Sequence, residues 1–95
     1  MNIAELEILC RVRRERLAEY AFKSGSKRTG LVSVGQASWL LNISRIRVYA
    51  LVVLERLGER SVGGQLLIRV RDIFQFAIDG ERRLAAAKKR ETTTR

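Results

Sequence analysis

The chain has 95 residues, of which 46% are hydrophobic, and this composition suits a single domain with a modest core. Its 19 Lys and Arg residues against 10 Asp and Glu give a net charge of +9, which predicts a polyanionic partner, with nucleic acid as the first candidate. With no histidine and one cysteine, the sequence excludes Ser–His and Cys–His catalysis and argues against a metal site. We therefore expect neither an enzyme nor a cofactor, metal or small-molecule ligand.

The first predicted element is a helix over residues 3–23, with Asn2 as its N-cap and Gly25 placed to end it. Cys10 lies among apolar residues of this helical pattern and is predicted to be a buried thiol. The stretch RVRRER at 11–16 interrupts the apolar stripe. It is interpreted either as a phosphate-binding strip or as a solvated helix face.

We expect a cytoplasmic, nucleoid-associated protein without a membrane segment. Glu5 and Glu7 charge the apolar N-terminal stretch, which argues against a signal peptide. The longest uncharged window, residues 29–44, is too short to span a bilayer.

Two short capped helices are predicted next. Residues 33–36, Ser-Val-Gly-Gln, form a capping box that opens a helix over 34–41. Asn42 tolerates the left-handed conformation that turns the chain. Ser44 then caps a second helix that extends to about Leu57.

The C-terminal half predicts a β-hairpin and a last helix. Short strand-like runs flank Gly63-Gly64, a pair that suits a two-residue turn because both central residues can need positive φ. The resulting hairpin covers residues 59–69. Asp72 is the candidate N-cap of the final helix, and the end of the chain from residue 85 is predicted to fray into disorder.

This order of elements predicts a mainly α fold with a small β-hairpin wing. A short helix, a three-residue turn, a second helix and a Gly-tipped hairpin are the layout of a winged helix-turn-helix, here flanked by N- and C-terminal helices. We divide the chain into an N-terminal helix with a basic loop (1–30), the winged helix-turn-helix core (31–80) and the end of the C-terminal helix with a basic tail (81–95). Helix 44–57 would enter the major groove of DNA by its N-terminus, with the 59–69 wing on the adjacent backbone.

From about residue 31 to 78, the chain contains VSVGQASWLLNISRIRVYALV followed by SVGGQLLIRVRDI. In these residues it resembles the small excisionase-like, MerR-type winged helix-turn-helix DNA-binding domains. The resemblance implies that Ser44, Arg45 and Arg47 start a recognition helix and meet bases or phosphates. It also implies that Tyr49 supports a backbone contact beside the wing. The alternative is that the two arginines are solvated helix charges and that Tyr49 is an aromatic residue at the edge of the core.

The resemblance has two departures: the family often has basic residues at the positions of Ala50 and Gln65. Their absence weakens the phosphate contacts that the resemblance implies. The expected function is still that of a sequence-preferring DNA-binding protein, a small transcriptional regulator or an excisionase-like recombination directionality factor. The residues expected to touch double-stranded DNA are Ser44, Arg45, Ile46, Arg47, Tyr49, Ala50, Arg60, Gly63, Gly64 and Gln65.

The side of helix 44–57 opposite its core-facing residues is unexpectedly apolar. Helical geometry points Ile46, Ala50, Val53 and Leu57 away from the core. Ile46 and Ala50 could touch thymine methyl groups. Val53 and Leu57 are expected to pack against the N-terminal helix, from the same chain or from a second copy. A homodimer could therefore form through the N-terminal helix or through this apolar side.

A second function fits the same features, that of a protein–protein adaptor or assembly subunit of a phage or plasmid complex that keeps the winged fold. The apolar side of helix 44–57 and the missing basic residues at Ala50 and Gln65 favour it. RNA binding is a third alternative, which is less favoured because aromatic residues for base stacking are few. Trp39 in particular is predicted to pack against the N- or C-terminal helix.

Overall fold

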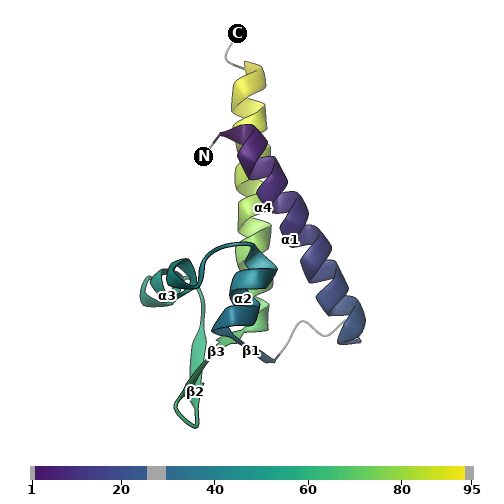
Figure 1. Cartoon of the computed structure of the whole chain (residues 1–95). Coiled ribbons are helices and arrows are strands. Elements are labelled where there is room, and N and C mark those ends of the chain that lie inside the picture. The colour runs from purple at the N-terminus through teal and green to yellow at the C-terminus, as the bar shows by residue number, and fades with distance from the viewer. Residues whose placement is uncertain (1, 26–29, 94–95) are drawn as a thin grey trace.

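The computed structural model describes residues 2–25 and 30–93, which form four helices and a three-stranded antiparallel sheet (Figure 1). The elements are α1 (Ile3–Lys23), β1 (Leu31–Ser33), α2 (Val34–Leu41), α3 (Arg45–Val53), β2 (Glu59–Val62), β3 (Gln65–Arg69) and α4 (Val70–Thr93). The long helices α1 and α4 pack against each other, and α2, α3 and the sheet lie around the start of α4. This confirms a mainly α fold with a small antiparallel sheet. None of the helices in the described part of the chain is long and apolar enough to cross a membrane.

Helix α1 begins and ends at the predicted residues. The Asn2 side-chain oxygen accepts the Glu5 amide at 2.8 Å, and the Asn2 amide group donates to the Glu5 carboxylate at 2.8 Å. The first bond satisfies a backbone amide that has no partner within the helix, and the second joins the two side chains. At the other end, Ser24 is the C-cap and Gly25 has φ +70°, a left-handed conformation that glycine adopts without steric cost. The loop predicted after it falls on residues 26–29, outside the described residues.

The predicted turn between α2 and α3 is confirmed in its details. The Ser33 hydroxyl accepts the Gln36 amide at 3.1 Å at the start of α2. Asn42 follows α2 in the left-handed conformation, with φ 52° and ψ 49°. The Ser44 hydroxyl then accepts the Arg47 amide at 3.1 Å, so α3 starts from a capped N-terminus.

The prediction that the second helix reaches Leu57 was wrong, because α3 ends at Val53. Glu55 takes a positive φ of 58°, and the amides of Arg56 and Leu57 both donate to the Leu51 carbonyl, at 2.8 and 3.3 Å. This turn folds the chain back and leaves Leu57 only 1% exposed. Leu57 is therefore a core residue and not part of the outward side. Burying a leucine side chain contributes about 1.5–3 kcal/mol, which offsets the loss of the last helical turn.

The predicted hairpin is confirmed, and a third strand joins it. Gly63 and Gly64 have φ of 56° and 79°, as a type I′ turn requires, and Val62 pairs with Gln65 across the turn. The unpredicted strand β1 pairs antiparallel with β3, so the sheet order is β1-β3-β2. This sheet covers one side of the core.

Helix α4 differs from its prediction at both ends. It begins at Val70, so Asp72 is not its N-cap but lies in its first turn. The Asp72 carboxylate instead accepts the amide of Gly58 at 2.9 Å. At the other end the helix continues to Thr93, and the prediction that the tail frays from residue 85 was wrong as far as the structure describes it. An ion pair between Lys88 and Glu7 joins this part of α4 to the start of α1.

A single core lies between the helices and the sheet. Cys10 is buried as predicted, and burial, followed by the nearby Glu81 charge, raises the pKa of its thiol. Trp39 packs against the N-terminal helix as predicted, with the Arg16 guanidinium 4.6 Å from its ring centroid. The largest fully buried side chains belong to Leu40, Leu41, Leu57, Ile68, Ile73, Val48, Val70 and Cys10.

Candidate nucleic-acid interface

Helix α3 presents an apolar face to solvent. Val48 and Leu51 point into the core, whereas Ile46 and Val53 are 81% and 80% exposed. Leu54, the C-cap of α3, is also exposed, and Ala50 is partly exposed. The N-terminal helix does not cover this face, since α1 packs on α4 and α2. The prediction that α1 of the same chain covers Val53 was therefore wrong.

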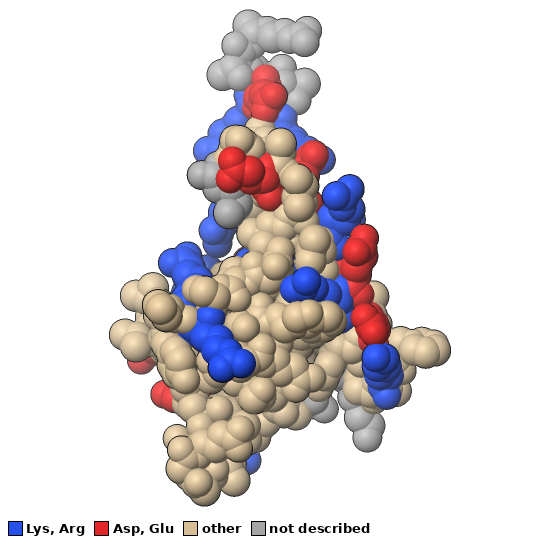
Figure 2. Space-filling view, viewed as in Figure 1, with Lys and Arg blue, Asp and Glu red and all other residues tan. Residues whose placement is uncertain are grey.

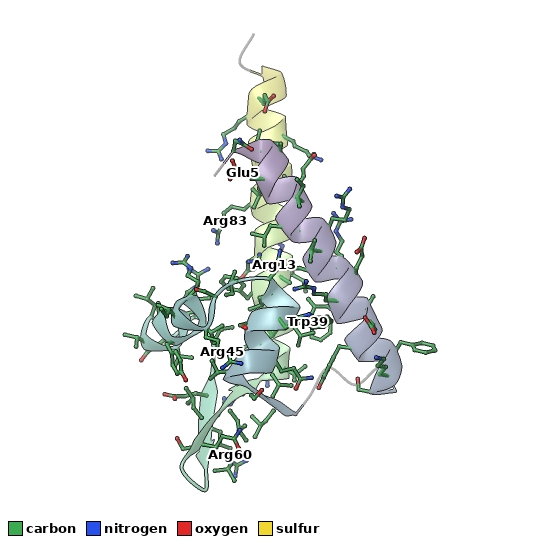
Figure 3. All side chains as sticks on the ribbon, in the orientation of Figure 1. Glu5, Arg13, Trp39, Arg45, Arg60 and Arg83 are labelled. Atoms are coloured by element: carbon green, nitrogen blue, oxygen red, sulfur yellow. The ribbon has the colours of Figure 1, made fainter. Side chains whose placement is uncertain are left out.

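Arg45 flanks one side of this face, towards the hairpin. Its guanidinium lies over Gly35 of α2, where an added Cβ would be 2.9 Å from Arg45 Nη2. Figure 3 shows Arg45 beside α2, above the hairpin. A surface hollow of about 270 Å³ is lined by Ser33, Val34, Gly35, Arg45, Tyr49, Gln65 and Leu66. The fold thus brings together three of the predicted site residues, Arg45, Tyr49 and Gln65.

Arg47 flanks the opposite side of the face, towards α1 and α4. It lines a separate hollow of about 150 Å³ together with Leu6, Leu9, Arg13, Ile43, Phe76, Gly80 and Arg83. Arg83 reaches from α4 towards the side on which α3 lies (Figure 3). Arg45 and Arg47 were predicted to act together, but they lie on opposite sides of α3. Arg83 was not predicted, because it is 36 positions from Arg47 and no local pattern links the two.

Arg60 of the hairpin belongs to a third group. It lines a shallow hollow of about 540 Å³ with Gly30, Leu31, Arg69 and Arg71. Arg60 pairs in register with Leu67, two residues from Arg69 on β3, so strand alternation puts Arg60 and Arg69 on the same face of the sheet. This alternation could have identified Arg69 from the sequence. Arg71 needed the start of α4 to be known.

The remaining predicted site residues lie at the ends of these elements. Ser44 is exposed at the N-terminus of α3, where its hydroxyl is used as the helix cap. Gly63 and Gly64 form the exposed tip of the hairpin, and a Cβ at either would meet no atom within 4 Å. The space around the tip is therefore open, and its backbone is accessible.

The arginines of the RVRRER stretch differ in their surroundings, since Arg11 and Arg14 are exposed and Arg13 is buried. Arg13 is 6% exposed, and its Nε–H donates to the Leu41 carbonyl at 2.7 Å. Arg14 pairs with Glu81 of α4 at 2.5 Å, and Arg16 donates to the Trp39 carbonyl at 2.5 Å. Both sequence interpretations, a phosphate-binding strip and a solvated face, were therefore wrong for Arg13, whereas Arg14 does lie on a solvated face, with 61% of its side chain exposed.

The arginines around α3 and the hairpin form no salt bridge with another described residue. Within residues 2–25 and 30–93, no salt bridge involves Arg45, Arg47, Arg60 or Arg83. The ion pairs Arg14–Glu81 and Lys88–Glu7 join α1 to α4, and two further pairs lie within one of these helices, Lys23–Glu19 in α1 and Arg82–Asp79 in α4. On the face shown in Figure 2, most acidic side chains correspondingly lie over the two long helices. The arrangement can therefore attract an anion at the end of the molecule that carries α3 and the hairpin.

Comparison with protein-family models, with curated proteins and with solved structures found no match for the chain.

Proposed function

We propose that the chain is a sequence-preferring double-stranded DNA-binding protein with a winged helix-turn-helix architecture. It would act as a small transcriptional regulator or recombination directionality factor, by binding alone and without chemistry. The observation that carries the proposal is the outward face of α3, which is uncovered and has Arg45 and Arg47 on its two sides with no salt-bridge partner in the described part of the chain.

The dimensions of α3 suit the major groove. A helix with its side chains is about 10–12 Å across, which fits a major groove about 12 Å wide, and the nine residues of α3 give about 13 Å of helix to lie in it. Because Arg45 and Arg47 lie on opposite flanks of α3, each can meet one of the two phosphate backbones that border the groove. The apolar face of α3 between the two arginines can then contact the base edges.

The hairpin supplies the second contact. Its Gly63-Gly64 tip has no side chains, so the backbone amides can approach phosphates closely. Arg60, with Arg69 and Arg71 beside it, adds positive charge to one face of the hairpin. Such charges bind DNA by displacing counterions, which makes the affinity depend steeply on salt.

Replacing Arg45 and Arg47 together by alanine should weaken DNA binding at least tenfold at physiological salt. The plot of log affinity against log salt should also become shallower by about 2, since each lost phosphate contact removes about 0.9 from its slope. The measurement is fluorescence anisotropy of a labelled duplex selected from random DNA, titrated at four salt concentrations.

The matched control replaces Arg11 and Arg82, two exposed arginines of the long helices, by alanine. It removes the same net charge, and it should leave the slope within about 0.5 of the parent value. If both double variants lower the slope equally, the DNA contact is non-specific attraction, and the assignment of α3 as the recognition helix is wrong.

A protein–protein adaptor is the second candidate function, and the exposed apolar side chains of Ile46, Val53 and Leu54 favour it. This function predicts a stable oligomer or complex formed through α3. Light scattering with retention on heparin distinguishes the two functions. An oligomer that ignores heparin and DNA at about 0.15 M salt would favour the adaptor.

A further inference from the structure

We propose that Ile46 reads the C5-methyl group of thymine, so that the preferred DNA sites carry thymine at the base pair facing the first turn of α3. The inference rests on the proposed DNA-binding function and adds to it a class of target sequence.

Ile46 and Val53 are the two residues of α3 that point most directly away from the protein, and Ile46 is the one near its N-terminus. At about 100° per residue, its side chain lies about 170° around the helix from the midpoint of the buried Val48 and Leu51. Its 81% exposure agrees with this geometry. It also lies in the first turn of α3, and recognition helices contact base edges mainly with their N-terminal residues.

The chemistry of isoleucine restricts what it can face in a groove. It has no donor or acceptor, so placing it against a polar base edge would leave that edge without its hydrogen bonds. In the major groove, thymine alone among the four bases presents a methyl group. Ala50, one turn further along and partly exposed, adds a second small apolar contact on the same side.

Two features of the structure favour DNA over a protein partner on this face. The apolar strip is bordered by Arg45 and Arg47, and no acidic residue occurs from position 45 to 54, so the occupant should be anionic at its edges and apolar at its centre. The strip is also short: stable protein interfaces take about 20–30 residues from each side, whereas α3 has nine in total. A groove with phosphate walls and a thymine methyl matches both features.

The test replaces each thymine of the selected duplex, one at a time, by deoxyuridine, which removes only the methyl group. We expect one or two positions at which binding weakens about fourfold, the effect of exposing one methyl-sized apolar group. In the Ile46→Ala variant the same positions should show equal affinity for thymine and uracil. The matched control is Ile8→Ala, the same change on an exposed residue of α1, which should keep the fourfold ratio.

The outcomes separate this inference from the proposed function. Selective binding that is insensitive to every uracil, or selected sites without thymine opposite α3, would overturn the reading of Ile46 and leave the DNA-binding function standing. Failure to bind any duplex above the non-specific level would overturn both. The protein could also form an oligomer that the Ile46→Ala substitution dissociates into monomers, with no change in the ratio of affinities for thymine and uracil duplexes. This result would assign the face to a second copy and also overturn the inference.

Discussion

Replacing Arg13 by alanine is expected to lower the free energy of unfolding by about 3 kcal/mol, because a hydrogen bond to a charged group contributes about 1.5–3 kcal/mol and lost packing adds to it. The Arg13 Nε–H donates to the Leu41 carbonyl, and its guanidinium lies 5.2 Å from the Phe76 ring centroid. Burial lowers the pKa of Arg13, so the charged form is held at a cost that these contacts must offset. Thermal denaturation should show a midpoint lower by about 12–24 °C, at 4–8 °C per kcal/mol for a domain of this size.

The control for Arg13 is Arg11→Ala, since Arg11 is exposed on the same helix. It should change the free energy of unfolding by about 0.5 kcal/mol or less. Arg13→Lys keeps the charge but loses the Nε–H, and it should fall between the two. Equal midpoints for the Arg11 and Arg13 alanine variants would show that the buried contact does not stabilise the fold.

Replacing Gly58 by alanine is expected to cost about 3 kcal/mol, since overpacking costs about 1–3 kcal/mol and losing a hydrogen bond to a charged group about 1.5–3 kcal/mol. The Gly58 amide donates to the Asp72 carboxylate at 2.9 Å. An added Cβ would overlap that carboxylate oxygen and lie 3.0 Å from Arg69 Cδ. Urea denaturation followed by circular dichroism measures the change.

A double-mutant cycle tests the cause of the Gly58 effect. In an Asp72→Ala background the clashing oxygen and the hydrogen bond are both absent, so Gly58→Ala should cost at least about 1 kcal/mol less than in the parent chain. Additive costs would locate the effect in backbone conformation and not in the contact with Asp72.

The sequence predicted those features that depend on residues close together in the chain. The caps at Asn2, Ser33 and Ser44 each join residues three positions apart, and the left-handed Asn42 is a local preference. The Gly63-Gly64 turn is local in the same sense. Such interactions are decided by a few neighbouring dihedral angles, so the pattern alone predicts them.

The features that the sequence did not predict depend on distant partners. Asp72 reads as a helix cap until its bond to Gly58, 14 residues away, is known. From the sequence, Arg13 was expected on a solvated or phosphate-binding surface, because its hydrogen bond to the Leu41 carbonyl joins residues 28 positions apart. Gly80 is likewise in contact with a distant residue, since an added Cβ there would be 3.1 Å from Arg13 Nη1.

The sequence predicted which residues belong to the candidate site better than it predicted how they are placed in space. Arg45, Tyr49 and Gln65 do line one hollow, but Arg47 belongs to another, and helical periodicity could not show which elements border each side of α3. Leu57 was assigned to the outward side because the helix was extended one turn too far. The positive φ of Glu55, which ends α3, has no signal in the sequence, since glutamate rarely adopts it.

The pairing of α1 with α4 also has a practical consequence for experiments on the intact protein. The molecule measures 55 Å along its longest axis, and the start of α1 and the end of α4 lie away from the hairpin, towards the other end of the molecule (Figure 1). A fluorophore or fusion partner attached near residue 2 or residue 93 would therefore be held away from α3 and the hairpin. A reporter at either position would not cover the surface that it is meant to study.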